Sequence, residues 1–335
     1  MRSIRARCSQ SALVVLWTAT ILLCTLGHGQ VGHSDPPRPG VNTAGVRRPM
    51  ADIRPEATFS VAGHPDWMVV IDDAVWVTSS NVNHVVRLDA LKNQAGPIVT
   101  INNPCSGLAT GFGSIWVPSC GTHSLFRVDP HTGKIQGEIP VGPADSEGGI
   151  TAGAGSVWMA SDKKGVLARV DPQTNKLAAE VAIPSGSYAP AFADGAIWIT
   201  STEHNLLTRV DVQSNKVAAS VRVGPQPRFL TVGAGSVWTL NQGDGTISRV
   251  DTKTSKLVAT IPVGIPGTGG EIAFGEGFVW ATVFQIPISR IDPATNTVVQ
   301  QWTGAGGDSI RIGHGSIWLT DLAHGVVWRL NPKQP

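Results

Sequence analysis

The side chains best suited to bind a polar ligand are charged residues in loops that vary between the copies of a repeated pattern. They are Asp66, Glu147, Arg228, Glu271, Asp308 and Arg311. Trp67 and Tyr188 stand in the same set of loops and add aromatic surface. A ring of such groups can bind a small polar ligand or a cation, and water can equally satisfy it. We predict a ligand-binding site here and assign no catalytic residue.

Other kinds of chemistry find less support. The chain contains no nucleophile elbow, zinc-binding motif, P-loop or dinucleotide-binding fingerprint. Four histidines, His84, His123, His204 and His324, stand in comparable loops of four repeats. A metal ion needs its ligands within about 2 Å, whereas loops of separate repeats diverge outward. We therefore interpret these histidines as solvated loop residues and expect no metal or cofactor.

These residues are placed by a repeat of about 40 residues, and one tryptophan marks each copy. The seven are Trp76, Trp116, Trp158, Trp198, Trp238, Trp280 and Trp318. A period near 40 with four short alternating runs per copy is typical of a propeller blade. The sequence therefore predicts an all-β fold, a seven-bladed β-propeller of four-stranded blades.

The third copy shows how one blade divides into strands, named A to D from the axis outward. Its four runs are residues 150–152, 156–160, 167–171 and 176–183. Gly153-Ala-Gly155 predicts a tight A–B turn, because glycine reaches positive φ without steric cost. Asp171-Pro-Gln-Thr-Asn-Lys176 predicts the C–D turn, because Asp can bond nearby amides and Asn tolerates the left-handed position.

Features present in every copy must serve folding. We therefore interpret the seven tryptophans as core between blades. An Arg-x-Asp pair follows six of them, from Arg87/Asp89 onward, and Arg329/Asn331 follows the seventh; we interpret these pairs as structural ion pairs and turn bonds. Trp67 and Trp302 lie off the tryptophan register. Trp67, near the axis at the start of blade 1, is the aromatic residue that we expect to stack on a ligand.

Features that differ between copies are free to serve function. Because strands alternate in direction, the A–B and C–D turns share one face of the disc, and the D–A and B–C loops share the other. The first face repeats the same phrases, whereas the loops of the second face vary. Loops on a rigid scaffold commonly carry binding groups. We therefore place the site on the second face, around the mouth of the central channel.

The two ends of the repeat region complement each other. The seventh copy stops after its third run, while Ala57–Ala62 has the pattern of a fourth run. We predict that this N-terminal strand completes the last blade, which closes the ring and removes both open edges. The predicted domains are a signal peptide at residues 1–29, a flexible linker at 30–55 and the propeller at 56–335.

The first 29 residues have the features of a secretory signal peptide. Arg2, Arg5 and Arg7 precede an apolar run from Ala12 to Leu26, which is short for a membrane span. A retained membrane anchor is the alternative. Losing the three arginines would take the formal charge from +2 to −1, which leaves little to attract nucleic acid. We expect an exported, periplasmic or extracellular protein without a stable membrane span after cleavage, whose partner is a small polar ligand or a protein.

Cleavage would also remove Cys8 and Cys24 and leave two cysteines, Cys105 and Cys120. An even pair in an exported chain indicates a disulfide. The two residues flank the A–B hairpin of the second copy, whose turn centres on Phe112, and stand one residue out of register at its open end. We predict that they form a disulfide bond and brace the adjacent loop.

Three phrases carry a family resemblance over residues 57–331: Gly-Ala-Gly-Ser-Val-Trp, Ser-Arg-Val-Asp and Asp-Pro-x-Thr-Asn-Lys. They resemble the repeats of YVTN-type, YncE-like and virginiamycin B lyase-like seven-bladed propellers. The resemblance implies the propeller fold. It does not imply one activity, because this repeat phrase recurs in propellers of different function.

The lyase-like propellers open a cyclic ester by elimination, and the resemblance implies His and Glu residues with magnesium on loops of the later blades. The matching positions lie near Arg228, at 267–269 and just after Trp280; they hold no His, and Val283 stands where a Glu is expected. Glu271 or His204 could substitute. We therefore expect a non-catalytic extracytoplasmic binding propeller. A lyase that breaks a C–O bond of a cyclic ester with metal assistance is the alternative.

Overall fold

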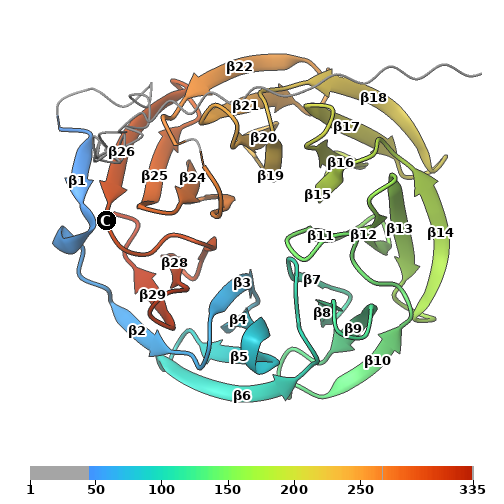
Figure 1. The fold of residues 1–335 in the computed structure, drawn as a ribbon, viewed down its shortest axis with the longest axis horizontal. Coiled ribbons are helices and arrows are strands. Elements are labelled where there is room, and N and C mark those ends of the chain that lie inside the picture. Colours follow the sequence, from blue (N-terminus) through green and yellow to red (C-terminus); the bar gives the residue numbers. More distant parts are fainter. Residues whose placement is uncertain (1–44, 266, 334–335) are drawn as a thin grey trace, which may run out of the picture. The chain divides into compact units, whose positions relative to one another are not determined.

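The computed structural model describes residues 45–265 and 267–333. This part of the chain forms seven sheets, arranged around one axis with strand A innermost (Figure 1). Six sheets have four strands and the sixth blade has five. The predicted seven-bladed propeller is confirmed. The signal peptide and most of the linker predicted from the sequence lie outside the described residues.

Each blade is a meander of antiparallel strands. Blades 1 to 4 comprise β3 (Pro65–Val70), β4 (Ala74–Ser79), β5 (His84–Asp89) and β6 (Gln94–Thr100); β7 (Ala109–Gly111), β8 (Ser114–Ser119), β9 (Ser124–Val128) and β10 (Ile135–Ile139); β11 (Ile150–Gly153), β12 (Ser156–Asp162), β13 (Val166–Asp171) and β14 (Lys176–Ala182); β15 (Ser187–Ala193), β16 (Ala196–Ser201), β17 (Leu206–Asp211) and β18 (Lys216–Arg222). A short 3₁₀ helix, η2 (Ser80–Val82), lies in the B–C loop of blade 1.

The last three blades follow the same order, with one exception at the end. They comprise β19 (Pro227–Gly233), β20 (Ser236–Asn241), β21 (Thr246–Asp251) and β22 (Leu257–Pro262); β23 (Ile272–Gly275), β24 (Phe278–Val283), β25 (Ile286–Asp292) and β26 (Thr297–Thr303); β27 (Ile310–Gly313), β28 (Ser316–Asp321) and β29 (Val326–Leu330). The strands predicted for blade 3 agree with β11 to β14 within two residues.

The N-terminal segment supplies the missing strand of blade 7. Strand β2 (Ala57–Ser60) pairs antiparallel with β29 and buries Phe59. The predicted closure of the ring is therefore confirmed. Upstream, β1 (Arg47–Pro49) pairs parallel with β26 as a fifth strand of blade 6, and the 3₁₀ helix η1 (Met50–Asp52) follows it. The sequence suggested a linker here, because three residues are too few to show a strand pattern.

The tryptophan column forms the core between blades, as predicted. All seven tryptophans are fully buried, and each pairs across strands B and C with the arginine of its own blade. In blade 3 the Arg169 guanidinium lies 4.9 Å from the Trp158 ring centroid. The Trp158 indole N–H donates to the Gly153 carbonyl at 3.0 Å, which ties strand B to the A–B turn.

Four of the seven arginines connect neighbouring blades. The ion pair that the sequence suggested is present in blade 1, where Arg87 Nη1 lies 3.7 Å from Asp89 Oδ2. Arg169 donates to the Val212 carbonyl and to Asn215 Oδ1, both at 3.0 Å, in the C–D turn of blade 4. Its Nε also donates to Ser156 Oγ. The same bonds recur from Arg127 to blade 3, from Arg249 to blade 6 and from Arg329 to blade 1. The aspartates cap their own turns, as Asp171 does by accepting from the Gln173 amide at 2.8 Å.

The blades that lack this link differ from the others at predictable positions. The acceptor in the next C–D turn is Asn where the link exists, but Gly133 follows Arg87 and Ser255 follows Arg209. Arg290 meets no C–D turn, because β2 supplies the outer strand of blade 7, and it bonds Gln300 in its own blade. Among the described residues, Arg209 has no bond of this kind. Arg87 instead pairs with Asp73 at 2.6 Å within its own blade. The link therefore depends on an Asn in the left-handed conformation, where its amide oxygen faces the preceding blade.

We expect removal of the closing strand to destabilise the ring. A chain beginning at Gly63 should have an unfolding free energy about 3–5 kcal/mol lower than a chain beginning at Pro55. Without β2, the apolar surface that Phe59 covers is exposed and β29 becomes an open edge of blade 7. Guanidinium denaturation measures the difference. Equal midpoints for the two chains would contradict closure through β2.

We also expect Ser255→Asn to stabilise the protein by about 1 kcal/mol, because it supplies Arg209 with the acceptor that its counterparts have. Ser255→Gly is the matched control, since glycine accepts the positive φ of 54° but offers no side-chain acceptor. Thermal unfolding of the three proteins separates the two effects. A gain from Gly as large as that from Asn would show that only backbone strain matters.

Candidate functional site

The register of strands A and B aligns one set of residues around the axis. They stand ten residues before each blade tryptophan: Asp66, Ser106, Gly148, Tyr188, Arg228, Gly270 and Asp308. We call this ring and the residues in contact with it the mouth. Four of the eight predicted binding residues belong to the ring, which explains why they converge although the chain separates them widely.

Buried threonines on strand B hold the start of strand A in place. Thr282 Oγ1 accepts from the Glu271 amide at 2.8 Å and donates to the Asp308 carbonyl of the next blade at 2.8 Å. Thr200 does the same, with the Ala189 amide and the Arg228 carbonyl, both at 3.1 Å. Each threonine therefore fixes the mouth residues of its own blade against those of the next.

One side of the mouth is acidic. Asp66 of blade 1 and Asp308 of blade 7 are neighbours across the closure of the ring, and Asp308 Oδ1 accepts from the Gly270 amide of blade 6 at 3.2 Å. Burial, then the charge of Asp308, raises the pKa of Asp66 well above its usual value, and Glu147 and Glu271 add to the effect. Burial and Asp308 also raise the pKa of Glu147. Carboxyls from blades 1, 3, 6 and 7 thus influence one another around the axis.

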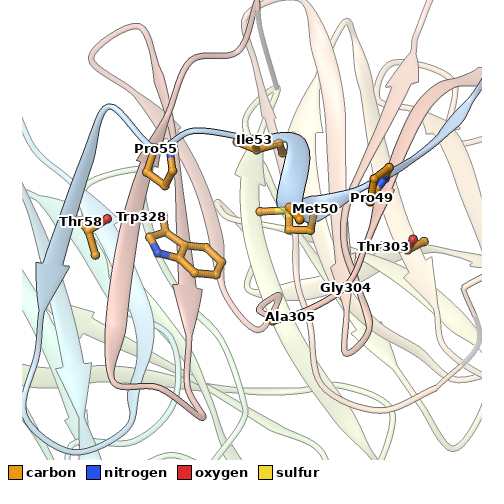
Figure 2. A pocket seen from close by; sticks show the side chains of 10 residues that line it. Pro49, Met50, Ile53, Pro55, Thr58, Thr303, Gly304, Ala305 and Trp328 are labelled. Carbon is orange, nitrogen blue, oxygen red and sulfur yellow. The ribbon is translucent and has the colours of Figure 1, made fainter.

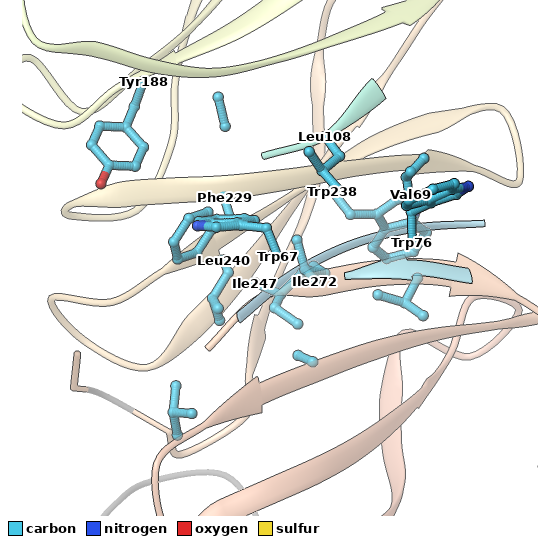
Figure 3. Packing of buried hydrophobic residues seen from close by; sticks show 14 of the residues in the cluster. Trp67, Val69, Trp76, Leu108, Tyr188, Phe229, Trp238, Leu240, Ile247 and Ile272 are labelled. Atoms are coloured by element: carbon cyan, nitrogen blue, oxygen red, sulfur yellow. The ribbon is translucent and has the colours of Figure 1, made fainter. Parts of the chain in front are cut away.

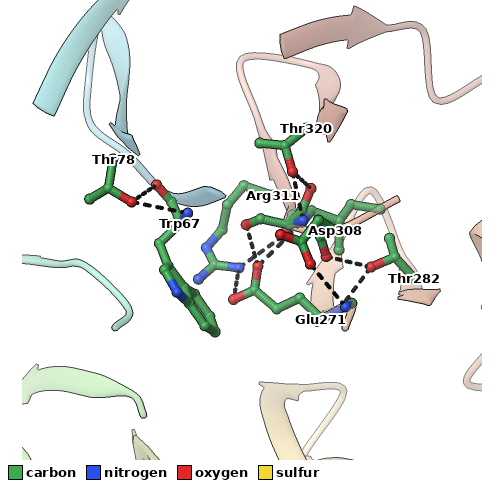
Figure 4. Close-up of polar contacts among 10 residues, drawn as sticks. Trp67, Thr78, Glu271, Thr282, Asp308, Arg311 and Thr320 are labelled. Carbon is green, nitrogen blue, oxygen red and sulfur yellow. Dashed lines mark hydrogen bonds and ion pairs between the residues drawn. The ribbon is translucent and has the colours of Figure 1, made fainter. Parts of the chain in front are cut away.

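Glu271 and Arg311 form an ion pair on this side (Figure 4). Glu271 is almost fully buried, and its Oε2 accepts from Ser309 Oγ at 2.6 Å and from the Ile310 amide at 3.2 Å. Burial raises its pKa, and Arg311 opposes that shift. Arg311 is the cross-strand partner of Trp318, a place that small or aliphatic residues occupy in the other six blades. A charged side chain at this position is therefore specific to blade 7.

The other side of the mouth is aromatic. The rings of Trp67 and Tyr188 lie 5.5 Å and 5.9 Å from that of Phe229 (Figure 3). The Arg228 guanidinium stacks on Tyr188 at 4.8 Å and donates to its hydroxyl from Nε at 2.9 Å. The tyrosine hydroxyl lies 3.5 Å from Asp145, which pairs with Lys163 at 2.9 Å. Burial raises the pKa of Tyr188, so it remains a neutral support for Arg228.

A cavity of about 280 Å³ opens beside the aromatic side. Its lining is formed by Tyr188, Thr202, Glu203, Gln226, Arg228, Gln242 and Thr268. This volume is at the lower end for ligand pockets. The cavity shares Tyr188 and Arg228 with the mouth, so a molecule bound there would contact the ring directly.

A disulfide braces the neighbouring loop of blade 2, as predicted. Cys105 and Cys120 are bonded, with their Cα atoms 5.8 Å apart. Pro104 and Ser119 form a bridge beside it, and Ser106 Oγ donates to the Gly148 carbonyl of blade 3. The disulfide therefore holds the D–A loop of blade 2 against the loop that carries Glu147.

The structure brings the eight predicted residues together but gives them different environments. Asp66, Glu147, Arg228, Asp308 and Arg311 are partly exposed, whereas Trp67, Tyr188 and Glu271 are buried. Trp67 is only 4% exposed, which leaves it little free surface for the predicted stacking on a ligand. Phe229 was missed, although it stands nine residues before its blade tryptophan, as Trp67 and Glu271 do. Alignment of the copies on the tryptophan would have found it.

The four loop histidines belong to separate blades. His204 Nε2 lies 2.9 Å from Ser185 Oγ, and His324 Nδ1 lies 2.7 Å from Asp321 Oδ2. Over residues 45–265 and 267–333, no three His, Cys, Asp or Glu side chains are arranged to hold a metal ion. Nor does that part contain a helix long and apolar enough to cross a bilayer.

A second cavity, of about 640 Å³, lies on the outer rim between η1 and blades 6 and 7 (Figure 2). Met50, Ile53, Pro55 and Trp328 form its mainly apolar wall. Unlike the mouth, this cavity is lined by no charged side chain.

The raised pKa of Asp66 predicts a pH dependence of stability. The folded state binds this proton more tightly than the unfolded chain does. The stabilisation from the protonated carboxyl is therefore complete below about pH 3.9, the pKa of Asp in an unfolded chain, and is lost as the pH rises through the pKa of Asp66 in the folded protein. Asp66→Asn should therefore match the parent protein in acid and exceed its stability near neutral pH.

Asp171→Asn provides a control of opposite sign. Hydrogen bonds from the Gln173 amide and from Thr174 lower the pKa of Asp171, so that variant should be less stable than the parent near neutral pH and equal to it in acid. Urea unfolding across the pH range tests both. Parallel curves for Asp66→Asn and the parent would show that Asp66 titrates alike in both states.

No protein-family model matches the sequence, and no curated protein matches it. Solved structures do resemble the fold. A streptogramin B lyase has a TM-score of 0.69 at 21% identity, with 82% of this chain and 96% of that chain covered. Virginiamycin B lyase from Staphylococcus aureus has a TM-score of 0.67 at 20% identity, with 82% and 98% covered. Hydrazine synthase from Kuenenia stuttgartiensis has 0.68 at 12%, with 84% and 98% covered. The chain therefore has the seven-bladed propeller fold that these enzymes share, and at such identities the likeness concerns the fold alone.

Proposed function

We propose that the chain is a non-catalytic binding propeller that acts outside the cytoplasm and holds a small polar ligand at the mouth. The observation that carries this proposal is the convergence of unrepeated polar side chains on one end of the axis. The repeated arginines form their links between blades on the opposite face, whereas Asp66, Arg228 and Asp308 stand at a position whose side chain varies among the blades. Export is supported by the signal-like N-terminal sequence and by the Cys105–Cys120 disulfide.

A C–O lyase acting on a cyclic ester is the alternative that the family resemblance raised. The residues that could substitute for its missing groups are committed to other contacts. Both oxygens of Glu271 are engaged, by Arg311 on one side and by Ser309 and the Ile310 amide on the other. Val283 is buried, and His204 contacts Ser185. These environments favour binding over elimination chemistry, which needs a free base beside the substrate.

Screening the mature protein by thermal shift against small polar molecules tests the proposal. A ligand at a hundred times its Kd should add about 2.7 kcal/mol to the unfolding free energy. Arg228→Ala should abolish the shift, whereas Arg222→Ala, on an exposed outer strand, should retain it. Loss of the shift in both variants, or in neither, would place the site elsewhere. Quinupristin is bound in a solved structure of a catalytically inactive virginiamycin B lyase of the same fold, and its opening by the purified protein would instead establish the lyase.

A further inference from the structure

Three carboxyls at the mouth have no ion-pair partner among the described residues: Asp66, Glu147 and Asp308. Arg311 is occupied by Glu271, and Arg228 is held on Tyr188. These side chains are only partly exposed, and carboxyls with restricted access to water and no counter-ion are costly to ionise, so a cation that enters between them gains from all three. The charge of the mouth thus selects for a positively charged ligand.

Within the described part of the chain, these carboxyls do not form a metal site. They come from blades 1, 3 and 7, and no three acidic groups in the described part of the chain are arranged to ligate one ion. An ammonium group suits them better, because its three N–H donors can reach separate acceptors at hydrogen-bond distance. The ligand is therefore an organic cation.

The aromatic side decides which kind of ammonium fits. A quaternary ammonium is recognised by free aromatic faces. Here Arg228 already covers the face of Tyr188, and Trp67 packs edge-on against Phe229. The carboxyls remain as the groups that can recognise the cation, and carboxylates favour a primary amine because it donates hydrogen bonds.

Two observations indicate that the ligand also carries polar groups. Trp67 is 4% exposed, and its indole N–H has no acceptor in the described structure. Figure 3 shows that its nitrogen lies on the side of Phe229 and Tyr188. A buried donor without an acceptor is costly. The adjoining cavity is lined by the neutral polar side chains of Thr202, Gln226, Gln242 and Thr268. A hydroxyl or carbonyl oxygen on the ligand would satisfy the Trp67 donor, and Gln226 and Thr268 offer further polar contacts.

We propose that the mouth binds a small primary amine that bears hydroxyl or carbonyl groups, with the ammonium among Asp66, Glu147 and Asp308 and the polar body beside Arg228. This inference rests on the proposed function and specifies its ligand class. A hydroxylated amine and an amino sugar share this chemistry, and the experiment distinguishes them.

Isothermal titration calorimetry with matched molecules provides the test. Ethanolamine and glucosamine are the amines. Ethylene glycol, glucose and N-acetylglucosamine are their uncharged counterparts. At least one amine should bind at least tenfold more tightly than its counterparts, and Asp308→Asn should weaken that binding about tenfold or more. Asp194→Asn, in the A–B turn on the opposite face, is the control and should leave it unchanged. Preference for ethanolamine or for glucosamine identifies the size of the ligand.

Proton linkage gives a second readout. Asp66 faces Asp308, Glu147 and Glu271, and Glu147 also faces Arg228 and Asp145. An ammonium favours the ionised carboxyls, so binding should release protons and tighten as the pH rises from about 5 to 7. Titrations in buffers of different ionisation enthalpy measure this release.

The outcomes separate this inference from the proposed function. Equal binding of amines and uncharged counterparts would overturn the ammonium while leaving a ligand-binding mouth. Amine binding that Asp308→Asn does not weaken, or that releases no protons, would place the cation elsewhere. If neither amine binds at millimolar concentration, the inference fails, and the screen with Arg228→Ala still decides whether the mouth binds another ligand.

Discussion

The whole ring depends on the connection between one blade and the next. In most blades an arginine lies over its own tryptophan and donates to a carbonyl and an asparagine in the following C–D turn. The charge is satisfied by neutral oxygens, so the bond needs no carboxylate and depends little on salt. Its last instance, from Arg329 to Ala90 and Asn93, joins blade 7 to blade 1. Four arginines make this contact, and it fixes how the blades that carry the mouth sit against one another.

Because the connection lies at mid-blade and on the opposite face, the start of strand A is free to vary. Threonines hold the backbone there, and the side chains beyond them differ from blade to blade. The result is a mouth with an acidic side and an aromatic side. Arg311 lies on the acidic side and Arg228 on the aromatic side, each fixed by a buried residue of the preceding blade. The scaffold tolerates this asymmetry because the repeated arginine links lie on the opposite face.

The sequence predicted the fold well because the same short pattern of strand and turn residues recurs in each of the seven copies. Tryptophan spacing, turn residues and the missing last strand together specified the blades and the closure. Other features depended on distances that a sequence does not show. The contact between Asp66 and Asp308 exists only once the ring has closed, and the burial of Trp67 depends on Phe229 from the far side of the axis. Strand β1 was missed because it is short, and its three residues lie exposed on an outer edge.

The pairing of β2 with β29 also has a consequence for the order of events in synthesis. The first of these strands emerges from the ribosome long before its partner, so the joint between blades 7 and 1 forms last. Contacts so distant along the chain are slow to form and leave strand edges exposed meanwhile. Asp66 and Asp308 lie on the two sides of this joint. A molecule that bridges them would act as a latch, retaining the finished ring and discriminating against chains that have not yet closed.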